Sequence, residues 1–206
     1  MSVVIDYFYT HISPWAYLGH NAFIELAQKH DVTVRARPVD LSGVFASSGG
    51  LPLGKRHPAR QAYRFVEMQR WRDKRNVPLT MKPAFFPTPP ALPDCCAIAL
   101  AEAGKDALAF SASVFKAIWA DDKNIAEEPV LAECLADLGH EPAAILKAAQ
   151  SDEIKGIYTA NQEQAVHQGL IGSPTYVLNG EPFWGQDRLE ILEDALISKR
   201  GPYHPL

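Results

Sequence analysis

The chain has 206 residues, of which 47% are hydrophobic, and a formal net charge of −4. This length favours one domain, or one domain that carries a large insertion. The weakly acidic balance excludes the strongly basic classes that bind nucleic acid or an anionic membrane surface. No stretch is apolar for long enough to span a bilayer, and the N-terminus shows no signal-peptide pattern, so we expect a cytoplasmic protein.

The N-terminal stretch predicts a strand that leads into a helix. Residues 3–9 are β-branched and aromatic, and residues 14–30 repeat apolar positions at helical spacing. Ser13 is a good N-cap, and Pro14 suits the first helical turn. The free N–H groups at such a helix start attract an anion, and a thiolate is one such anion. These residues leave two interpretations of Ser13 open: a helix cap alone, or a cap that also stabilises an anion.

A second strand and a loop follow. Residues 32–39 alternate apolar and polar side chains and end near Pro38, which predicts a strand. Two strands joined by a helix are parallel, with a right-handed crossover. Residues 40–58 are rich in glycine and proline and lack the spacing of a phosphate-binding motif, so we expect a plain loop.

The middle of the chain begins with a helix over residues 58–76 that is dense in arginine. Most of these arginines suit a solvated face, but Arg60 and Arg64, one turn apart, are also placed to approach a bound carboxylate. Residues 77–93 contain six prolines and predict extended coil. The Phe85-Phe86 pair in this coil either packs against the core or forms the wall of a ligand pocket.

Residues 94–169 predict a helix bundle with a core of its own. Asp94 is expected to cap the first of these helices. The three cysteines, Cys95, Cys96 and Cys134, are odd in number and form no C-x-x-C pair. They indicate buried, unreactive thiols rather than a disulfide framework or a zinc site, and no metal is expected.

The last forty residues return to strand periodicity. Residues 175–178 and 181–184 flank Asn179-Gly180, which is the strongest short hairpin signal, and a helix opens around residues 185–188. The predicted fold is therefore α/β, with a thioredoxin-like core of β-α-β and β-β-α halves and a large all-helical domain inserted between them. The core comprises residues 1–57 and 169–206, and the insertion residues 58–168.

Three motifs in this order identify a family resemblance that spans essentially the whole chain. They are Ser13-Pro14-Trp15 after the first strand, Gly172-Ser173-Pro174-Thr175 before the hairpin, and Phe183-Trp184-Gly185-Gln186-Asp187-Arg188 after it. The chain resembles the 2-hydroxychromene-2-carboxylate isomerases, which are kin of kappa-class glutathione transferases and DsbA-type oxidoreductases. Ser13 then takes the place of the first cysteine of a redox C-x-x-C motif. The resemblance implies that glutathione is the cofactor and brings the missing thiol.

The resemblance also assigns roles to individual residues. Ser13 is the expected catalytic residue, because its hydroxyl would stabilise the glutathione thiolate. The backbone of Ser173, before a cis Pro174, would pair with the cysteinyl part, and Gln186 with Asp187 would hold the zwitterionic γ-glutamyl end. The expected glutathione-binding set is Ser13, Arg60, Ser173, Pro174, Gly185, Gln186 and Asp187. The expected substrate-binding set is Trp15, Tyr17, Phe86 and Pro87.

Simpler interpretations of these positions stay open. Pro174 also fits an ordinary trans turn, and Asp187 also fits the first turn of a helix. His11 either lines the substrate side or is structural. The chain departs from the family pattern at Gly50, where many relatives have Asn, and at Arg60, where they often have Lys. Thr88-Pro89 also replaces a pattern that usually includes Asn, which leaves the identity of the substrate open.

The implied reaction is cis–trans isomerisation of a conjugated aryl-pyruvate, of the 2-hydroxychromene-2-carboxylate to trans-o-hydroxybenzylidenepyruvate type, by reversible thiolate addition. One alternative is a kappa-like glutathione transferase or peroxidase, which would release the conjugate. Another is a thioredoxin-like binding module without catalysis. The resemblance further implies a small-molecule substrate, an aryl-pyruvate or related enone, and a homodimer.

Overall fold

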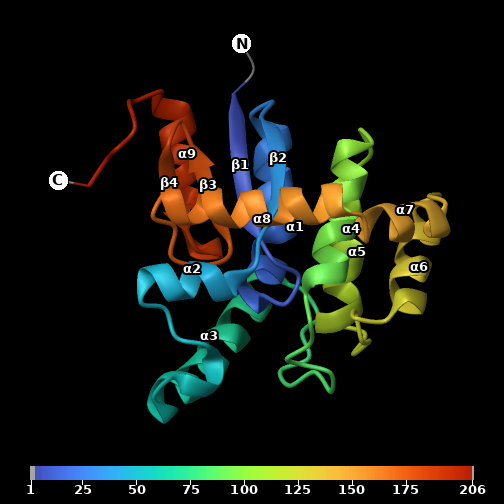
Figure 1. Ribbon diagram of the computed structural model, residues 1–206. Helices are drawn as coiled ribbons and strands as arrows, with labels where there is room; N and C mark the ends of the chain where they lie inside the picture. Colours follow the sequence, from blue (N-terminus) through green and yellow to red (C-terminus); the bar gives the residue numbers. More distant parts are fainter. Residues whose placement is uncertain (1–2, 206) are drawn as a thin grey trace.

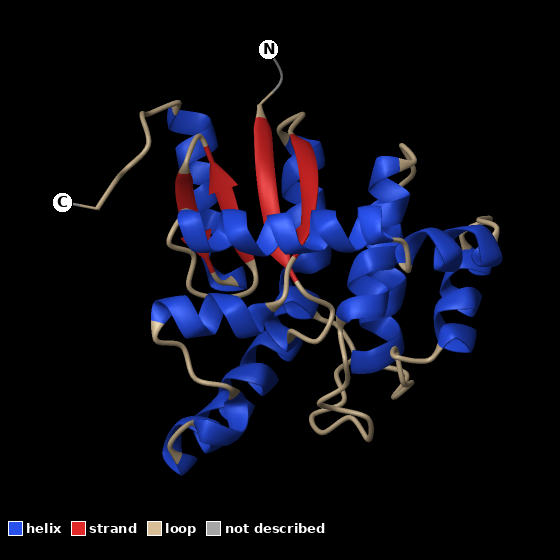
Figure 2. Cartoon of the chain, viewed as in Figure 1, coloured by secondary structure: helices blue, strands red, loops and turns tan. Residues whose placement is uncertain are grey.

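The computed structural model describes residues 3–205, which fold around a four-stranded sheet. The strands are β1 (Val4–Tyr9), β2 (Thr33–Pro38), β3 (Thr175–Leu178) and β4 (Glu181–Trp184), in the order β2-β1-β3-β4. β1 is parallel to β2 and antiparallel to β3, and β3 is antiparallel to β4. The β-α-β unit and the hairpin are thus both present as predicted, and residues from the two ends of the chain meet in one sheet (Figure 2).

Helices cover both faces of this sheet (Figure 1). In chain order they are α1 (Pro14–Lys29), α2 (Leu41–Ser48), α3 (Pro58–Arg75), α4 (Ala91–Glu102), α5 (Ala107–Trp119), α6 (Glu128–Asp137), α7 (Pro142–Ala149), α8 (Asp152–His167) and α9 (Leu189–Ser198). Short 3₁₀ turns, η1 (Leu53–Lys55) and η2 (Gln186–Arg188), precede α3 and α9. Among the described residues, none of these helices has the length and apolar character needed to cross a bilayer.

The core is aromatic on the sheet face that α1 covers. The Tyr7 ring stacks on the Tyr9 ring at 4.4 Å and on the Tyr176 ring at 5.3 Å, and Phe23 of α1 lies 4.4 Å from Tyr176. This cluster of buried side chains continues without interruption into α4, α5, α6 and α7. The expected separate core of the helical segment is therefore wrong, because these helices bury their apolar faces against the sheet layer as well as one another. The domain boundaries themselves stay a prediction.

The predicted loop over residues 40–58 is wrong for its first half, where α2 forms. Asp40 caps this helix by accepting a hydrogen bond from the Ser42 N–H at 2.8 Å, and Gly49, with φ of +73°, follows its last residue. Val44 is buried beside Phe8 in a second, smaller apolar cluster on the opposite face of the sheet. Burial of one side chain and two good caps thus offset the poor helix propensity of a segment that contains glycine.

The predicted cap at Asp94 is also wrong. α4 begins three residues earlier, at Ala91, and Asp94 lies in its first turn, fully buried. Its carboxylate accepts hydrogen bonds from Thr10, His11 and Tyr158 instead of capping N–H groups of its own helix. A buried carboxylate needs such partners, and here the segment between β1 and α1 and the helix α8 supply them.

Candidate functional site

Ser13 occupies the N-cap of α1, as predicted, and its hydroxyl makes two hydrogen bonds. The oxygen Oγ accepts one from the Ala16 N–H at 3.2 Å, and the hydroxyl donates one to the carbonyl oxygen of Ser173 at 3.1 Å. Ser13 is 5% exposed. It therefore lies at the positive end of a 16-residue helix, with its single proton directed across to the segment before β3.

Ser173 and Pro174 form the second wall of the site. Their peptide bond is cis, as the resemblance implies. The Thr10 N–H donates to Ser173 Oγ at 3.2 Å, and the Gly185 N–H donates to the Pro174 carbonyl oxygen at 2.9 Å. The segment before β3 is thus fastened on one side to the segment before α1 and on the other to the start of η2.

Asp94 anchors the loop that carries Ser13. One carboxylate oxygen lies 2.6 Å from His11 Nδ1 and accepts the His11 N–H at 3.1 Å. The other accepts the hydroxyls of Thr10 at 2.8 Å and Tyr158 at 3.0 Å. The His11 carbonyl oxygen accepts from Trp119 Nε1 at 3.0 Å. His11 is fully buried and its Nδ1 is bound to Asp94, which favours the structural role of the two left open for it.

The glycine of the third motif is required by the backbone. Gly185 has a φ of +108°, a backbone conformation that residues with a side chain rarely adopt. A Cβ at this position would lie 2.4 Å from Asp187 Oδ1. Gln186 is buried against Gly19 of α1, whereas the Asp187 side chain is 41% exposed and lies 3.3 Å from Arg188. The carboxylate of Asp187 is therefore available to a cationic group that approaches from solvent.

Arg75, the last residue of α3, holds Gln186 in place. Its Nε and Nη2 donate to Gln186 Oε1 at 3.2 and 3.1 Å, and Nη2 also donates to the Gln186 carbonyl oxygen at 3.0 Å. The amide oxygen of Gln186 is thus already bound, which leaves its NH₂ group free to act on a ligand. Sequence reasoning placed Arg75 on a solvated face, since nothing local marks a partner 111 residues away.

The two arginines near the start of α3 are not brought into contact with Ser13. Arg60 is exposed, and its side chain makes no hydrogen bond or ion pair with any residue that the structure describes. Arg64 is half-buried and lies over the rings of Phe65 and Phe86. The assignment of Arg60 to glutathione therefore stays a prediction.

Two of the expected substrate-binding residues lie in the first turns of α1, and the other two lie in the coil between α3 and α4. Trp15 is partly exposed in the first turn, and the Tyr17 hydroxyl donates to the Pro78 carbonyl oxygen at 2.5 Å. Burial raises the pKa of Tyr17 to about 12, with a smaller contribution from Asp121. The half-buried ring of Phe86 packs on Trp119 at 5.2 Å, and its peptide bond to the exposed Pro87 is cis. Both interpretations of Phe86, core contact and pocket wall, are compatible with this half-buried position.

The cysteines lie apart from this site. All three are buried and free of disulfides, as predicted. Burial raises the pKa of Cys95 to about 11 and that of Cys96 to about 12, and it also raises the pKa of Cys134. Since the thiolate is the reactive form, none of these side chains is suited to nucleophilic or redox chemistry.

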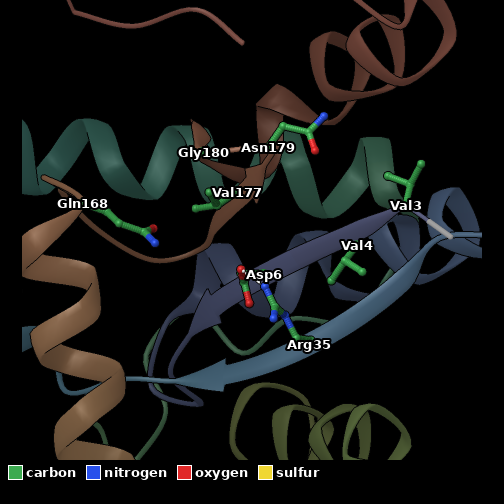
Figure 3. Close-up of a pocket in the computed structure, with 8 residues that line it drawn as sticks. All are labelled: Val3, Val4, Asp6, Arg35, Gln168, Val177, Asn179 and Gly180. Atoms are coloured by element: carbon green, nitrogen blue, oxygen red, sulfur yellow. Dashed lines mark hydrogen bonds and ion pairs between the residues drawn. The ribbon is translucent and has the colours of Figure 1, made fainter. Parts of the chain in front are cut away.

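A hollow in the structure lies at the other end of the sheet (Figure 3). It is lined by Val3, Val4, Asp6, Arg35, Gln168, Val177, Asn179 and Gly180. Its charged groups already satisfy one another, because the Asp6 carboxylate binds Arg35 at 2.6 Å and Arg37 at 3.1 Å. β1 runs from this hollow toward Ser13, so the hollow and the start of α1 are separated by the length of the strand.

Comparisons with known proteins point to one family. The DSBA-like thioredoxin domain matches residues 4–197. The chain is 29% identical to a 2-hydroxychromene-2-carboxylate isomerase of Sphingobium xenophagum, over 96% of this chain and 100% of that protein. It is 26% identical to the glutathione S-transferase kappa 1 of Caenorhabditis elegans, over 93% and 90% of the two chains.

A solved structure agrees with these matches. The structure of a 2-hydroxychromene-2-carboxylate isomerase superimposes with a TM-score of 0.81 at 27% identity, over 95% of each chain. The resemblance that the three motifs indicate and the predicted thioredoxin-like fold class are both confirmed.

Proposed function

The chain belongs to the DSBA-like thioredoxin domain family, and from this premise we propose that it is a glutathione-dependent cis–trans isomerase of a conjugated aryl-pyruvate. Ser13 carries the proposal: a buried hydroxyl at a helix N-terminus stands where a disulfide oxidoreductase of this fold would have a cysteine. Relatives of this chain that have a similar length and are named 2-hydroxychromene-2-carboxylate isomerase support the choice of reaction. An isomerisation needs no electron donor, which suits a site without a redox pair.

The residues around Ser13 fit glutathione, because they can stabilise a thiolate but include no cysteine that could supply one. The sequence Ser13-Pro14-Trp15-Ala16 contains no cysteine, and the three thiols of the chain are buried elsewhere. Bound glutathione would supply a thiolate that adds reversibly to a conjugated double bond, so that the bond can rotate before it is restored. The hydroxyl and the α1 dipole would favour the charged form of that sulfur.

To stabilise the glutathione thiolate, the Ser13 hydroxyl must donate its proton to the sulfur instead of to its present acceptor. In the structure it is donated to the Ser173 carbonyl oxygen, and a serine hydroxyl has one proton to give. A peptide N–H that pairs with the Ser173 carbonyl, as the resemblance implies for the cysteinyl part, would replace this donor. The hydroxyl could then turn toward the sulfur while Oγ keeps the Ala16 N–H.

The other end of the glutathione site would be formed by η2. The exposed Asp187 carboxylate suits an ammonium group, and the Gln186 NH₂ group, fixed by Arg75, suits a carboxylate. The buried Asp94 network would keep the Ser13 loop rigid while Ser173 and Pro174 pair with the ligand. A homodimer and a cytoplasmic location stay predictions, to be checked by sedimentation and cell fractionation.

A glutathione transferase is the second candidate, because the chain is also similar to two kappa-class transferases. The experiment is turnover of 2-hydroxychromene-2-carboxylate with glutathione at one-hundredth of its concentration. An isomerase brings the whole substrate pool to its equilibrium mixture with the product and leaves the free thiol unchanged, whereas a transferase stops after one equivalent of thiol is consumed. Absence of any glutathione-dependent reaction would leave a thioredoxin-like binding module.

A further inference from the structure

The start of α3 and the segments beside it carry cations without acidic partners. Arg56, Arg60, Arg64 and Lys82 form no ion pair with any group in residues 3–205. Farther along the same helix, Arg70 pairs with Glu67 and Arg72 with Asp73. The contrast lies within one helix, so it does not follow from a general shortage of carboxylates in a chain of net charge −4.

Arg64 is the most enclosed of these cations. Its guanidinium lies 5.6 Å from the centre of the Phe65 ring and 5.9 Å from that of Phe86. Burial lowers its pKa to about 10, and the neighbouring Arg56 contributes to the shift. None of its N–H groups has a hydrogen-bond partner among the described residues. A half-buried guanidinium whose five donors have no partner in the protein, beside a like charge, favours the binding of an anion.

A short chain of contacts joins Arg64 to the Ser13 loop. Phe86, which the guanidinium overlies, packs on Trp119 at 5.2 Å, and Trp119 Nε1 donates to the His11 carbonyl oxygen, two residues before Ser13. α3 and the segment that precedes α4 lie at the end of the molecule where β1 ends (Figure 1). The start of α3 therefore lies at the same end of the molecule as the Ser13 loop.

We propose that Arg64 determines substrate specificity by binding the carboxylate of an aromatic 2-oxo acid at the free edge of its guanidinium, beside the rings of Phe65 and Phe86. The inference rests on the proposed function and names the residue that selects the acid. A guanidinium whose edge N–H groups are free presents a planar fork to a planar carboxylate, and the flanking rings suit a conjugated, flat ligand. Arg56 adds a second positive charge that favours the same anion.

The carboxylate could come from the substrate or from the glycyl end of glutathione, and we assign it to the substrate because aromatic rings flank Arg64. The probe is trans-benzylidenepyruvate, and its methyl ester, which carries no charge, is the control ligand. Binding of each is measured by titration of tryptophan fluorescence, with and without S-methylglutathione, which cannot react. The variants are Arg64→Gln, the conservative Arg64→Lys, and Arg70→Gln as a control that removes one charge from the same helix.

The expected result is a 10- to 100-fold loss of affinity for the acid in Arg64→Gln, with a smaller loss in Arg64→Lys. Affinity for the ester should change less than twofold, and Arg70→Gln should bind the acid as the wild type does. Equal losses in Arg64→Gln and Arg70→Gln, an equal loss for the ester, or unchanged affinity for the acid would overturn the proposal. A loss confined to glutathione affinity would overturn the assignment to the substrate.

The same titrations separate this inference from the proposed function. If the wild type binds the acid through Arg64 but shows no glutathione-dependent turnover, the isomerase proposal fails and the specificity site stands. If turnover is present and Arg64→Gln keeps its affinity for the acid and its KM, the specificity site fails and the isomerase proposal stands.

Discussion

The hydroxyl of Ser13 donates a hydrogen bond to the carbonyl oxygen of Ser173 at 3.1 Å, across 160 positions of sequence. This contact joins the start of α1 to the segment before β3, so the two motifs that were recognised separately form one site. The same oxygen also accepts the Ala16 N–H, which makes Ser13 both a helix cap and a cross-link. A change at Ser13 must therefore be judged by stability as well as by activity.

Replacement of Ser13 by Ala should lower turnover by about 10²- to 10³-fold, the usual cost of losing one donor to a developing anion. It should also raise the pKa of bound glutathione, which is measured from thiolate absorbance as a function of pH. The free energy of unfolding should fall by about 1 kcal/mol because a cap is lost.

Ser151→Ala is the matched control for Ser13→Ala. Ser151 caps α8 through the Ile154 N–H at 3.3 Å, in another part of the fold. Its loss should cost a similar amount of stability and leave turnover unchanged. If both variants keep full activity, Ser13 is a cap and nothing more.

Asp187→Asn should weaken glutathione binding by about 10-fold, because the ammonium group of the γ-glutamyl end would lose its charged acceptor. Stability should stay within about 0.5 kcal/mol, since the side chain is on the surface. Calorimetric titration measures the affinity. Asp73→Asn, which changes another exposed aspartate paired with an arginine, is the control. Equal affinities in all three proteins would remove Asp187 from the site.

Arg75→Met should lower the free energy of unfolding, measured by urea denaturation, by about 1–3 kcal/mol. The reason is that two buried oxygens of Gln186 would lose their hydrogen-bond donor. It should also raise the KM for glutathione more than it lowers kcat, since Arg75 positions Gln186 without contacting the reacting atoms. Arg72→Met, in the same last turn but paired with the exposed Asp73, should change neither quantity. Unchanged stability in Arg75→Met would contradict this role.

His20 should make the protein less stable as pH falls from 6.5 to 4. Burial lowers its pKa from 6.5 to about 4, outweighing the opposite effect of its hydrogen bond to Leu108. In that window the unfolded chain binds a proton that the folded protein does not, so the free energy of unfolding rises with pH. The difference from this group alone is roughly 3 kcal/mol.

Urea unfolding at pH 4.5 and pH 7 measures this dependence. His20→Gln keeps a donor for the Leu108 carbonyl oxygen but cannot take up a proton, so its difference between the two pH values should shrink. His167→Gln, which changes an exposed histidine in the last turn of α8, should retain the difference found for the wild type. An undiminished difference in His20→Gln would contradict the assignment.

The elements predicted well are those that neighbouring residues determine. The Ser13 cap, the Asn179-Gly180 turn and the limits of α1 and α3 depend on contacts within a few residues, and these predictions are confirmed. α2 was missed because its stability comes from the burial of Val44 beside Phe8, which lies 36 residues earlier in the chain and cannot be recognised from local composition.

The sequence by itself therefore determined the order of the strands, the family resemblance and the position of Ser13 at a helix start, but not the helix α2. Only the tertiary structure decided which side chains from distant segments contact one another. It placed the Asp94 carboxylate on Thr10 and His11, Arg75 on Gln186, and Arg64 over the rings of Phe65 and Phe86. The physical reason is that helical spacing fixes which residues share a face, while the partner of a charged side chain on that face is selected by packing between distant segments.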